Sequence, residues 1–234
     1  MEPYPISKKL GFRRRFIHYF LLNLARLLFR AIPFEVFGKE HLPSEGVPTL
    51  LTSNHLSHVD SVFTAVAAFP IKRAIRFTGA ADFMQKIKFR WTKYELAFPV
   101  GRGPTEREKF IRISLTLLEN GESVGIYPEG GRSRTGKFQV DKVKVGAGWI
   151  AKLAGPITRV VPVFVYGTNN IIPVGKFFRL NFHTPIRIYF GPPLDLTRYY
   201  NLPNTLETST RITQEIVRGI LEERRKCLIN LANN

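Results

Sequence analysis

The residues with the clearest chemical potential lie at positions 54–60, between a pattern that predicts a strand and one that predicts a helix. His55 and Asp60 are separated by four residues, and a turn from strand into helix can bring the Asp60 carboxylate onto one imidazole nitrogen of His55. The carboxylate would fix the tautomer and stabilise the imidazolium, which leaves the other nitrogen to take a proton. A substrate that carries its own hydroxyl needs no Ser or Cys nucleophile in such a site. The spacing therefore allows a general base with a carboxylate partner.

Two other interpretations of the same segment stay open on spacing alone. Ser57 and Asp60 fit a capping box in its acidic form, in which Asp60 only caps the following helix. His55, His58 and Asp60 are also residue types that bind metal ions. A complete metal site would need further ligands, and the remaining histidines are isolated in the sequence: His18, His41 and His183. We therefore expect no metal.

A second candidate segment, 128–134, follows a pattern that predicts a buried strand. Gly130 and Gly131 would let backbone N–H groups approach an anion, and the planar guanidinium of Arg132 matches a phosphate group bidentately. Glu129 precedes them and is the only acidic residue of the segment. The alternative is a polar turn with solvated arginines.

A third segment, 98–103, ends another predicted strand and places Arg102 between two glycines. This arrangement also suits phosphate, with a plain turn as the alternative. In α/β proteins, sites form where strands end and helices begin. The three strand ends together supply a base, a carboxylate partner, one glutamate and two arginines, and their convergence is more informative than any one of them.

The elements that must position these residues alternate along the chain. Period-2 and continuous apolar runs predict strands at 34–38, 48–53, 74–77, 97–100, 124–127, 160–166 and 186–190. Helical patterns cover 57–69, 83–96, 107–120, 144–153 and 206–231. This alternation predicts an α/β fold, a single domain at 34–234 with a central mixed sheet flanked by helices.

Composition narrows the class of partner. The chain has 234 residues, a formal net charge of +17 and 44% hydrophobic residues, which excludes a largely disordered protein. A single cysteine, Cys227, excludes an intrachain disulfide framework and a cysteine-rich zinc module. The positive charge indicates a negatively charged partner: nucleic acid, an anionic membrane surface or a phosphorylated small molecule. No nucleic-acid-binding signature appears, so we expect no nucleic acid.

The N-terminal segment, 1–33, predicts an amphipathic helix. Its polar residues form one narrow stripe, and the rest of its surface is apolar: Tyr19, Asn23, Arg26 and Arg30 against Phe16, Ile17, Phe20, Leu21, Leu24, Leu27 and Leu28. Two arginines interrupt the apolar run, which disfavours both a secretory signal and a membrane-spanning helix. We expect a helix that lies in the interface of an anionic membrane, with a buried core helix as the alternative.

The order of these motifs resembles that of the glycerolipid acyltransferases, and most closely the 1-acyl-sn-glycerol-3-phosphate acyltransferases. The similarity covers residues 34–192 and rests on His55-x4-Asp60, Arg102, the run 128–133 and the Val-Pro-Val at 161–163. The chain departs from the usual pattern in having Ala80-Ala81-Asp82 where many members have Lys-x-Glu, and Gly131 where Thr is commonest.

The resemblance implies a role for each matched residue. His55 would be the general base and Asp60 the residue that orients it, while Arg102, Glu129, Gly130 and Arg132 would help to hold the substrate phosphate. The implied reaction moves a fatty acyl group from an acyl thioester, acyl-CoA or acyl carrier protein, to the hydroxyl of lysophosphatidic acid, without a cofactor. Glycerol-3-phosphate or another lysolipid is the alternative acceptor, and a metal-dependent hydrolase and a nucleic-acid-binding protein are the remote alternatives. The expected location is the cytoplasmic face of a membrane, such as the bacterial inner membrane.

Overall fold

The computed structural model describes residues 12–28, 30–69, 74–80, 97–101, 103–171, 173–174 and 184–233, in which strands and helices alternate as the sequence predicts. The strands are β1 (Phe34–Phe37), β2 (Thr49–Ser53), β3 (Ile75–Ala80), β4 (Phe98–Val100), β5 (Ser123–Ile126), β6 (Arg159–Tyr166) and β7 (Ile186–Phe190). The helices are α1 (Phe12–Leu28), α2 (Asp60–Ala68), α4 (Pro104–Glu119), α5 (Gly146–Ala154), α6 (Thr197–Tyr200) and α7 (Leu206–Ala232). Three short 3-10 turns, η1 (Lys39–His41), η4 (Val140–Lys142) and η5 (Thr168–Asn170), complete the described elements. The helix predicted at 83–96 lies outside the described residues.

The strands form one sheet in the order β1-β7-β6-β2-β5-β3-β4. Strand β2 lies between β5 and β6 and runs parallel to both, whereas β6 and β7 are antiparallel, which confirms the predicted mixed sheet. Strand β4 is parallel to β3, which is parallel to β5. The carboxyl ends of β2, β3, β4, β5 and β6 therefore meet at one edge of the sheet, where the segments singled out from the sequence begin.

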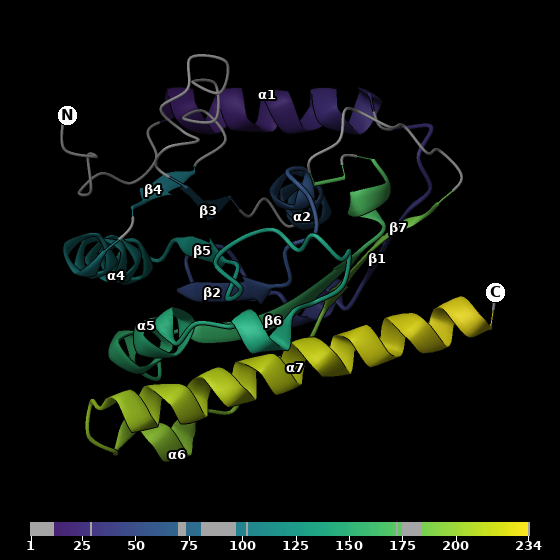
Figure 1. Ribbon diagram of the computed structural model, residues 1–234. Helices are drawn as coiled ribbons and strands as arrows, with labels where there is room; N and C mark the ends of the chain where they lie inside the picture. The colour runs from purple at the N-terminus through teal and green to yellow at the C-terminus, as the bar shows by residue number, and fades with distance from the viewer. Residues whose placement is uncertain are drawn as a thin grey trace.

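Both faces of the sheet are covered, and the alternation of side chains along β6 shows why. Val160 and Phe164 belong to the core beneath α4, α5 and α7, whereas Val161, Val163 and Val165 belong to the core beneath α1 and α2. Successive residues of a strand point to opposite faces, so a strand covered on both sides must be apolar throughout. The helices accordingly form two layers with the sheet between them (Figure 1).

Two helices begin at positions that differ from the predicted ones for local reasons. Helix α4 begins at Pro104 rather than residue 107, because proline suits the first turn, where its missing N–H is not needed. Helix α2 begins at Asp60 rather than at residue 57. The backbone amides of Leu56 and Ser57 are held by the Asp60 side chain and do not enter the helix.

Helix α1 packs on α2 through part of its polar stripe. The Tyr19 ring meets Phe69 edge to face with ring centroids 5.5 Å apart, and the Arg26 guanidinium lies over the same ring. The side of α1 that faces away from its buried Leu22 and partly buried Ala25 carries an exposed apolar row at helical spacing, formed by Phe16, Phe20, Leu24 and Leu27. None of the helices that the structure describes has the length and apolar content needed to cross a bilayer.

Candidate active site

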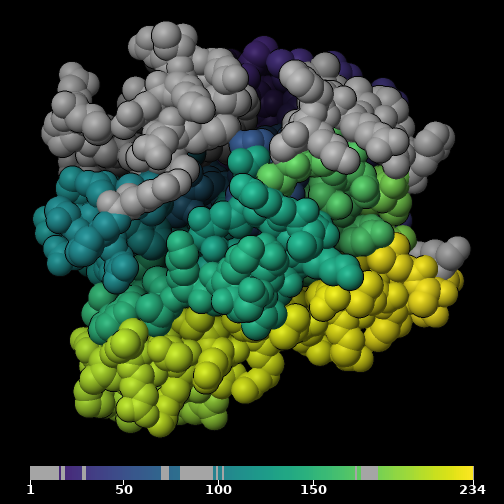
Figure 2. Space-filling view, in the orientation of Figure 1, coloured from purple at the N-terminus to yellow at the C-terminus, as the bar shows by residue number. Residues whose placement is uncertain are grey.

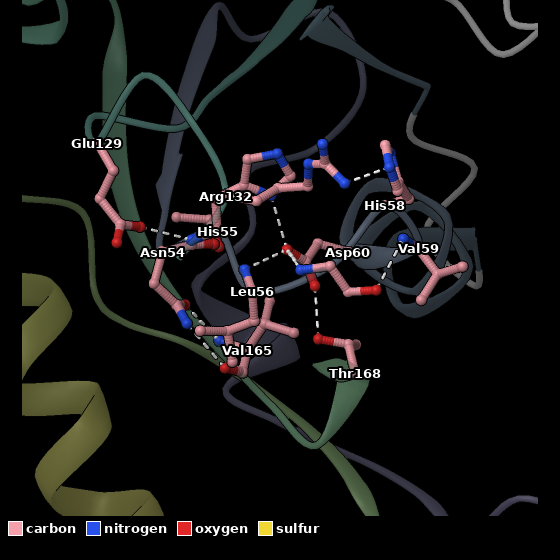
Figure 3. Close-up of polar contacts among 12 residues, drawn as sticks. Asn54, His55, Leu56, His58, Val59, Asp60, Glu129, Arg132, Val165 and Thr168 are labelled. Carbon is pink, nitrogen blue, oxygen red and sulfur yellow. Dashed lines mark hydrogen bonds and ion pairs between the residues drawn. The ribbon is translucent and has the colours of Figure 1, made fainter. Parts of the chain in front are cut away.

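His55 and Asp60 form a hydrogen-bonded pair at the carboxyl end of β2 (Figure 3). His55 Nδ1 lies 2.7 Å from Asp60 Oδ2; the His55 side chain keeps 18% of its surface exposed, whereas that of Asp60 is fully buried. A carboxylate can only accept, so Nδ1 carries a proton, and in the neutral imidazole the lone pair then lies on Nε2. The pair predicted from spacing is therefore assembled with one imidazole nitrogen ready to take a proton.

Asp60 also organises the turn between β2 and α2. Its Oδ2 accepts the backbone N–H groups of Leu56 at 2.6 Å and Ser57 at 2.8 Å, and its Oδ1 accepts the hydroxyl of Thr168 at 2.5 Å. These contacts do not form the capping box that spacing allowed, because α2 begins at Asp60 itself, with Val59 as the N-cap and no side-chain cap. The buried carboxylate instead bonds both the turn before the helix and the imidazole.

The backbone of His55 is held on both sides by the loop that follows β5. Its N–H donates to Glu129 Oε2 at 2.7 Å, and its carbonyl accepts the N–H of Ser133 at 2.7 Å. The neighbouring Asn54 side chain is clamped to β6, donating to the Val165 carbonyl at 2.9 Å and accepting its N–H at 2.8 Å. The first and second sequence segments, 54–60 and 128–134, therefore interlock through the backbone of the candidate base, and its imidazole takes no part in these contacts.

Glu129 joins two backbone segments of the site. It is 5% exposed, and its two carboxylate oxygens accept the backbone N–H groups of His55 and Gln139, the latter at 2.9 Å. These contacts make Glu129 a brace for the two segments, and its role toward the phosphate stays a prediction. Burial raises the pKa of Glu129 to about 7, and the negative charge of Asp60 raises it further. The two backbone N–H groups and the positive charge of Lys142 lower this pKa, but by less.

Gly130 stabilises the turn that follows β5. Its N–H donates to the Tyr127 carbonyl at 2.9 Å, and its role toward the phosphate stays a prediction. Its φ of 67° lies in the left-handed region that glycine tolerates, and a Cβ there would lie 2.8 Å from Lys144 Nζ. The absence of a side chain at Gly130 therefore lets the Lys144 ammonium lie against the loop.

The raised pKa of Glu129 predicts a pH-dependent contribution to stability. Between pH 4.5, the ordinary pKa of a glutamate, and about pH 7, Glu129 keeps its proton in the folded protein but loses it in the unfolded chain. Its contribution to stability is therefore fully present below pH 4.5 and is lost as the pH rises through 7. Relative to Glu129→Gln, the wild-type free energy of unfolding should fall by up to about 3 kcal/mol between about pH 4.5 and about pH 7.5. Urea unfolding of both proteins across that range measures the difference. A difference that stays constant with pH would contradict the assignment.

Arg132 lies beside the pair, and His58 contacts it. An Arg132 Nη1–H donates to His58 Nε2 across the mouth of the turn before α2 (Figure 3). Desolvation lowers the pKa of the half-buried Arg132. The other predicted phosphate residue, Arg102, lies outside the described residues.

Within the described ranges, His, Cys, Asp and Glu side chains do not gather in groups of three that could hold a metal ion, so the geometry lends no support to the alternative of His55, His58 and Asp60 as ligands.

A row of aromatic rings connects His55 to an apolar pocket. The Tyr127 ring stacks on the imidazole with centroids 3.8 Å apart, and Phe77 stacks on Tyr127 at 5.9 Å. Gly125 makes room for Phe77, because a Cβ there would lie 2.4 Å from the ring. The pocket lies under α1, and its lining is Leu21, Leu22, Ala25, Ser61, Val62, Ala65, Phe77 and Ala97.

Three contributors to the site were not predicted. Thr168, Asn54 and Tyr127 had no assigned role, although Asn54 is inside the first segment and Tyr127 directly precedes the second. Thr168 lies at the end of β6, which pairs with β2 in parallel and so ends at the same edge. One sequence signal could have indicated Thr168: it follows the most strand-like run of the chain, as His55 and Glu129 each follow a predicted strand.

The face in view in Figure 2 shows the teal surface after β5 in the centre and α7, in yellow, along the lower side. The teal segment contains Arg132 and the basic residues Arg134, Lys137, Lys142 and Lys144. The same segment includes Ser133, whose N–H donates to the His55 carbonyl.

Comparison with known proteins gives similar sequences and a similar fold. The chloroplast 1-acyl-sn-glycerol-3-phosphate acyltransferase LPAT1 of Arabidopsis thaliana is 27% identical over 186 residues, 78% of this chain and 50% of the relative. The chloroplast 1-acyl-sn-glycerol-3-phosphate acyltransferase BAT2 of Brassica napus is 29% identical over 188 residues, 78% of this chain and 52% of the relative. The chain thus spans about half the length of these curated relatives.

The crystal structure of the 1-acyl-sn-glycerophosphate acyltransferase PlsC from Thermotoga maritima superposes with a TM-score of 0.60 at 22% identity, covering 89% of this chain and 81% of that one. This match shows a shared fold. The family model described as Acyltransferase matches residues 33–166, more than half of the chain and the part that holds β2, β5 and the His55–Asp60 pair. The chain therefore belongs to the Acyltransferase family.

Proposed function

We propose that this protein transfers a fatty acyl group from an acyl thioester to the free hydroxyl of lysophosphatidic acid, giving phosphatidic acid. The observation that carries the proposal is the His55–Asp60 pair, with Nδ1 tied to the carboxylate and Nε2 left to act as a base. The names of the relatives, 1-acyl-sn-glycerol-3-phosphate acyltransferases, support the choice of acceptor. The basic loop at 130–144 supports a phosphorylated substrate.

In the proposed reaction, His55 Nε2 removes the hydroxyl proton while the hydroxyl oxygen attacks the thioester carbonyl carbon. The tetrahedral intermediate collapses with cleavage of the C–S bond, and His55 returns its proton to the departing thiolate. The products are an ester and a free thiol, so no protein nucleophile, metal or cofactor enters the balance. The Asp60 carboxylate stabilises the imidazolium between the two proton transfers.

The site offers contacts for both parts of the acceptor and the acyl group. Arg132 is the described residue that would bind the phosphate, because it lies beside His55 and presents a planar set of donors. Arg102 is proposed as the second cation from the sequence alone. The apolar pocket under α1, which the row Phe77–Tyr127 joins to His55, has the lining that a hydrocarbon chain requires.

A panel of substrates tests the proposal. Purified protein in lipid vesicles would be assayed for thiol release with acyl-CoA and with acyl carrier protein as donors. The acceptors would be lysophosphatidate, glycerol-3-phosphate, a lysolipid with a different headgroup and monoacylglycerol, which lacks the phosphate. Turnover should be fastest with lysophosphatidate and poor with monoacylglycerol. Faster turnover with glycerol-3-phosphate would reassign the acceptor, and no turnover with any pair would overturn the proposal.

We further propose that the exposed row of α1 docks the protein on an anionic membrane. Phe16, Phe20 and Leu27 each expose about 60% or more of their surface in the described chain, and apolar side chains in such a row are stabilised in a bilayer interface. Replacing Phe20 and Leu27 by aspartate should lower binding to anionic vesicles at least about tenfold, because each loses apolar burial and adds a repelled charge.

Vesicle sedimentation measures this binding. The matched control replaces two equally exposed apolar residues elsewhere, Ile157 and Leu206, by aspartate. It adds the same charge but leaves α1 intact, so its binding should stay close to that of the wild type. Equal loss of binding in both double variants would show a general charge effect and contradict docking through α1.

A further inference from the structure

His58 holds a position that the proposed reaction does not yet use. It lies in the turn between His55 and the start of α2, and its partly exposed imidazole reaches across to the loop that follows β5. There its Nε2 accepts an N–H from Arg132, a residue 74 positions away in the chain (Figure 3). The contact joins the turn that carries the candidate base to the loop that carries the candidate phosphate ligand.

The chemistry of this contact requires a neutral imidazole. A guanidinium has only donors, so the imidazole nitrogen that faces it must carry the lone pair and the proton must lie on Nδ1. Burial, together with the positive charges of Arg132 and His55, lowers the pKa of His58 to about 4, against a smaller rise from Asp60. His58 is therefore neutral at physiological pH and attracts Arg132 where a protonated imidazole would repel it.

Resting on the proposed function, we propose that His58 is a positioning residue that holds the Arg132 guanidinium toward the phosphate of the acceptor. A long arginine side chain loses rotamer freedom when it binds a ligand, and a partner that restricts it beforehand reduces that loss. The bond to His58 uses one of five N–H donors, which leaves an edge of the guanidinium for phosphate oxygens. The acceptor is then bound with its hydroxyl close to His55.

The proposal separates binding from chemistry, because His58 acts through Arg132 and does not touch the reacting atoms. Replacing His58 by alanine should raise the KM for lysophosphatidate about tenfold, the size expected for one hydrogen bond to a charged group. It should change kcat by less than about twofold, because the His55–Asp60 pair does not depend on it. The KM for monoacylglycerol, which has no phosphate, should not change.

Two conservative variants distinguish positioning from a merely structural role. The amide oxygen of glutamine reaches about as far as His58 Nε2 and can accept from Arg132, whereas the amide of asparagine reaches only as far as Nδ1. His58→Gln should therefore restore a KM close to that of the wild type, and His58→Asn should behave like His58→Ala. If glutamine and asparagine act alike, the acceptor atom at Nε2 has no special role and the inference is overturned.

A double-mutant cycle with Arg132→Ala completes the experiment. Arg132→Ala alone should raise the KM for lysophosphatidate, and adding His58→Ala should raise it no further. An equal rise from His58→Ala in both backgrounds would show that His58 acts independently and overturn the inference. If Arg132→Ala raises KM but His58→Ala does not, the phosphate role of Arg132 survives and only the role of His58 fails. If the protein turns over lysophosphatidate but Arg132→Ala leaves KM unchanged, both roles fail.

Discussion

Replacing His55 by alanine is expected to lower kcat by at least about 10²–10⁴-fold, the range that a positioned general base contributes. The substitution removes the base but not the structure around it. The backbone N–H and carbonyl of His55 remain bonded to Glu129 and Ser133, because neither contact involves the imidazole. The KM for the acceptor should change little, since the proposed phosphate ligand is a different residue, Arg132.

The measurement is kcat in lipid vesicles for the wild type and the variant, with thermal unfolding of both as a check of folding. His41→Ala is the matched control. Its imidazole Nδ1 contacts the Phe190 carbonyl at 2.7 Å, and β7, which carries Phe190, is separated from β2 by β6. The control should keep its activity. A His55→Ala protein that is folded and retains near-normal kcat would refute the catalytic role.

Replacing Asp60 by asparagine is the second change with a large expected effect, a fall of about 10²–10⁴-fold in kcat. The amide oxygen of asparagine can take the place of Oδ2 and accept from His55, Leu56 and Ser57, while its NH2 group faces the Thr168 hydroxyl, which can turn to accept. The contacts are therefore retained, but the negative charge that stabilises the imidazolium is lost. The free energy of unfolding should fall by only about 1–3 kcal/mol.

Thr168→Val is the matched control for this prediction. It removes the hydroxyl that donates to Asp60 Oδ1 but keeps the carboxylate charge and the contact with His55. Its kcat should fall by less than about tenfold, since one neutral donor is lost from a network of four. The comparison uses kcat and urea unfolding of the two variants. A larger loss of kcat for Thr168→Val than for Asp60→Asn would show that the network, and not the charge of Asp60, governs activity.

The fold class was predictable because each strand and helix has its own pattern. The apolar run of β6 can be buried on both faces only in a sheet covered by helices on both sides, and the structure confirms this. The pairing of His55 with Asp60 could be expected for the same local reason, since the four positions between them leave the turn few conformations. Arg102 and the helix at 83–96 stay predictions, because they lie outside the described residues.

The roles of Glu129 and Gly130 could not be deduced from residue type. A glutamate between a buried strand and two glycines suits an anion site as well as a brace, and only the position of the neighbouring strand distinguishes them. In the folded chain the loop after β5 passes along the end of β2, so the backbone N–H groups of His55 and Gln139 donate to Glu129. The bracing role of Glu129 therefore came from the tertiary structure, and its role toward the phosphate stays a prediction.

The sequence itself thus determined that His55 and Asp60 could pair across one turn, and the order of the motifs favoured this pair over a helix cap or a metal site. What the sequence left open was the set of residues that hold the pair in place. Asn54 with Val165 and Asp60 with Thr168 are separated by 111 and 108 positions, and they meet because β2 and β6 are neighbouring parallel strands that end together. Strand order depends on the packing of the whole sheet against two layers of helices, so these contacts became known only with the tertiary structure.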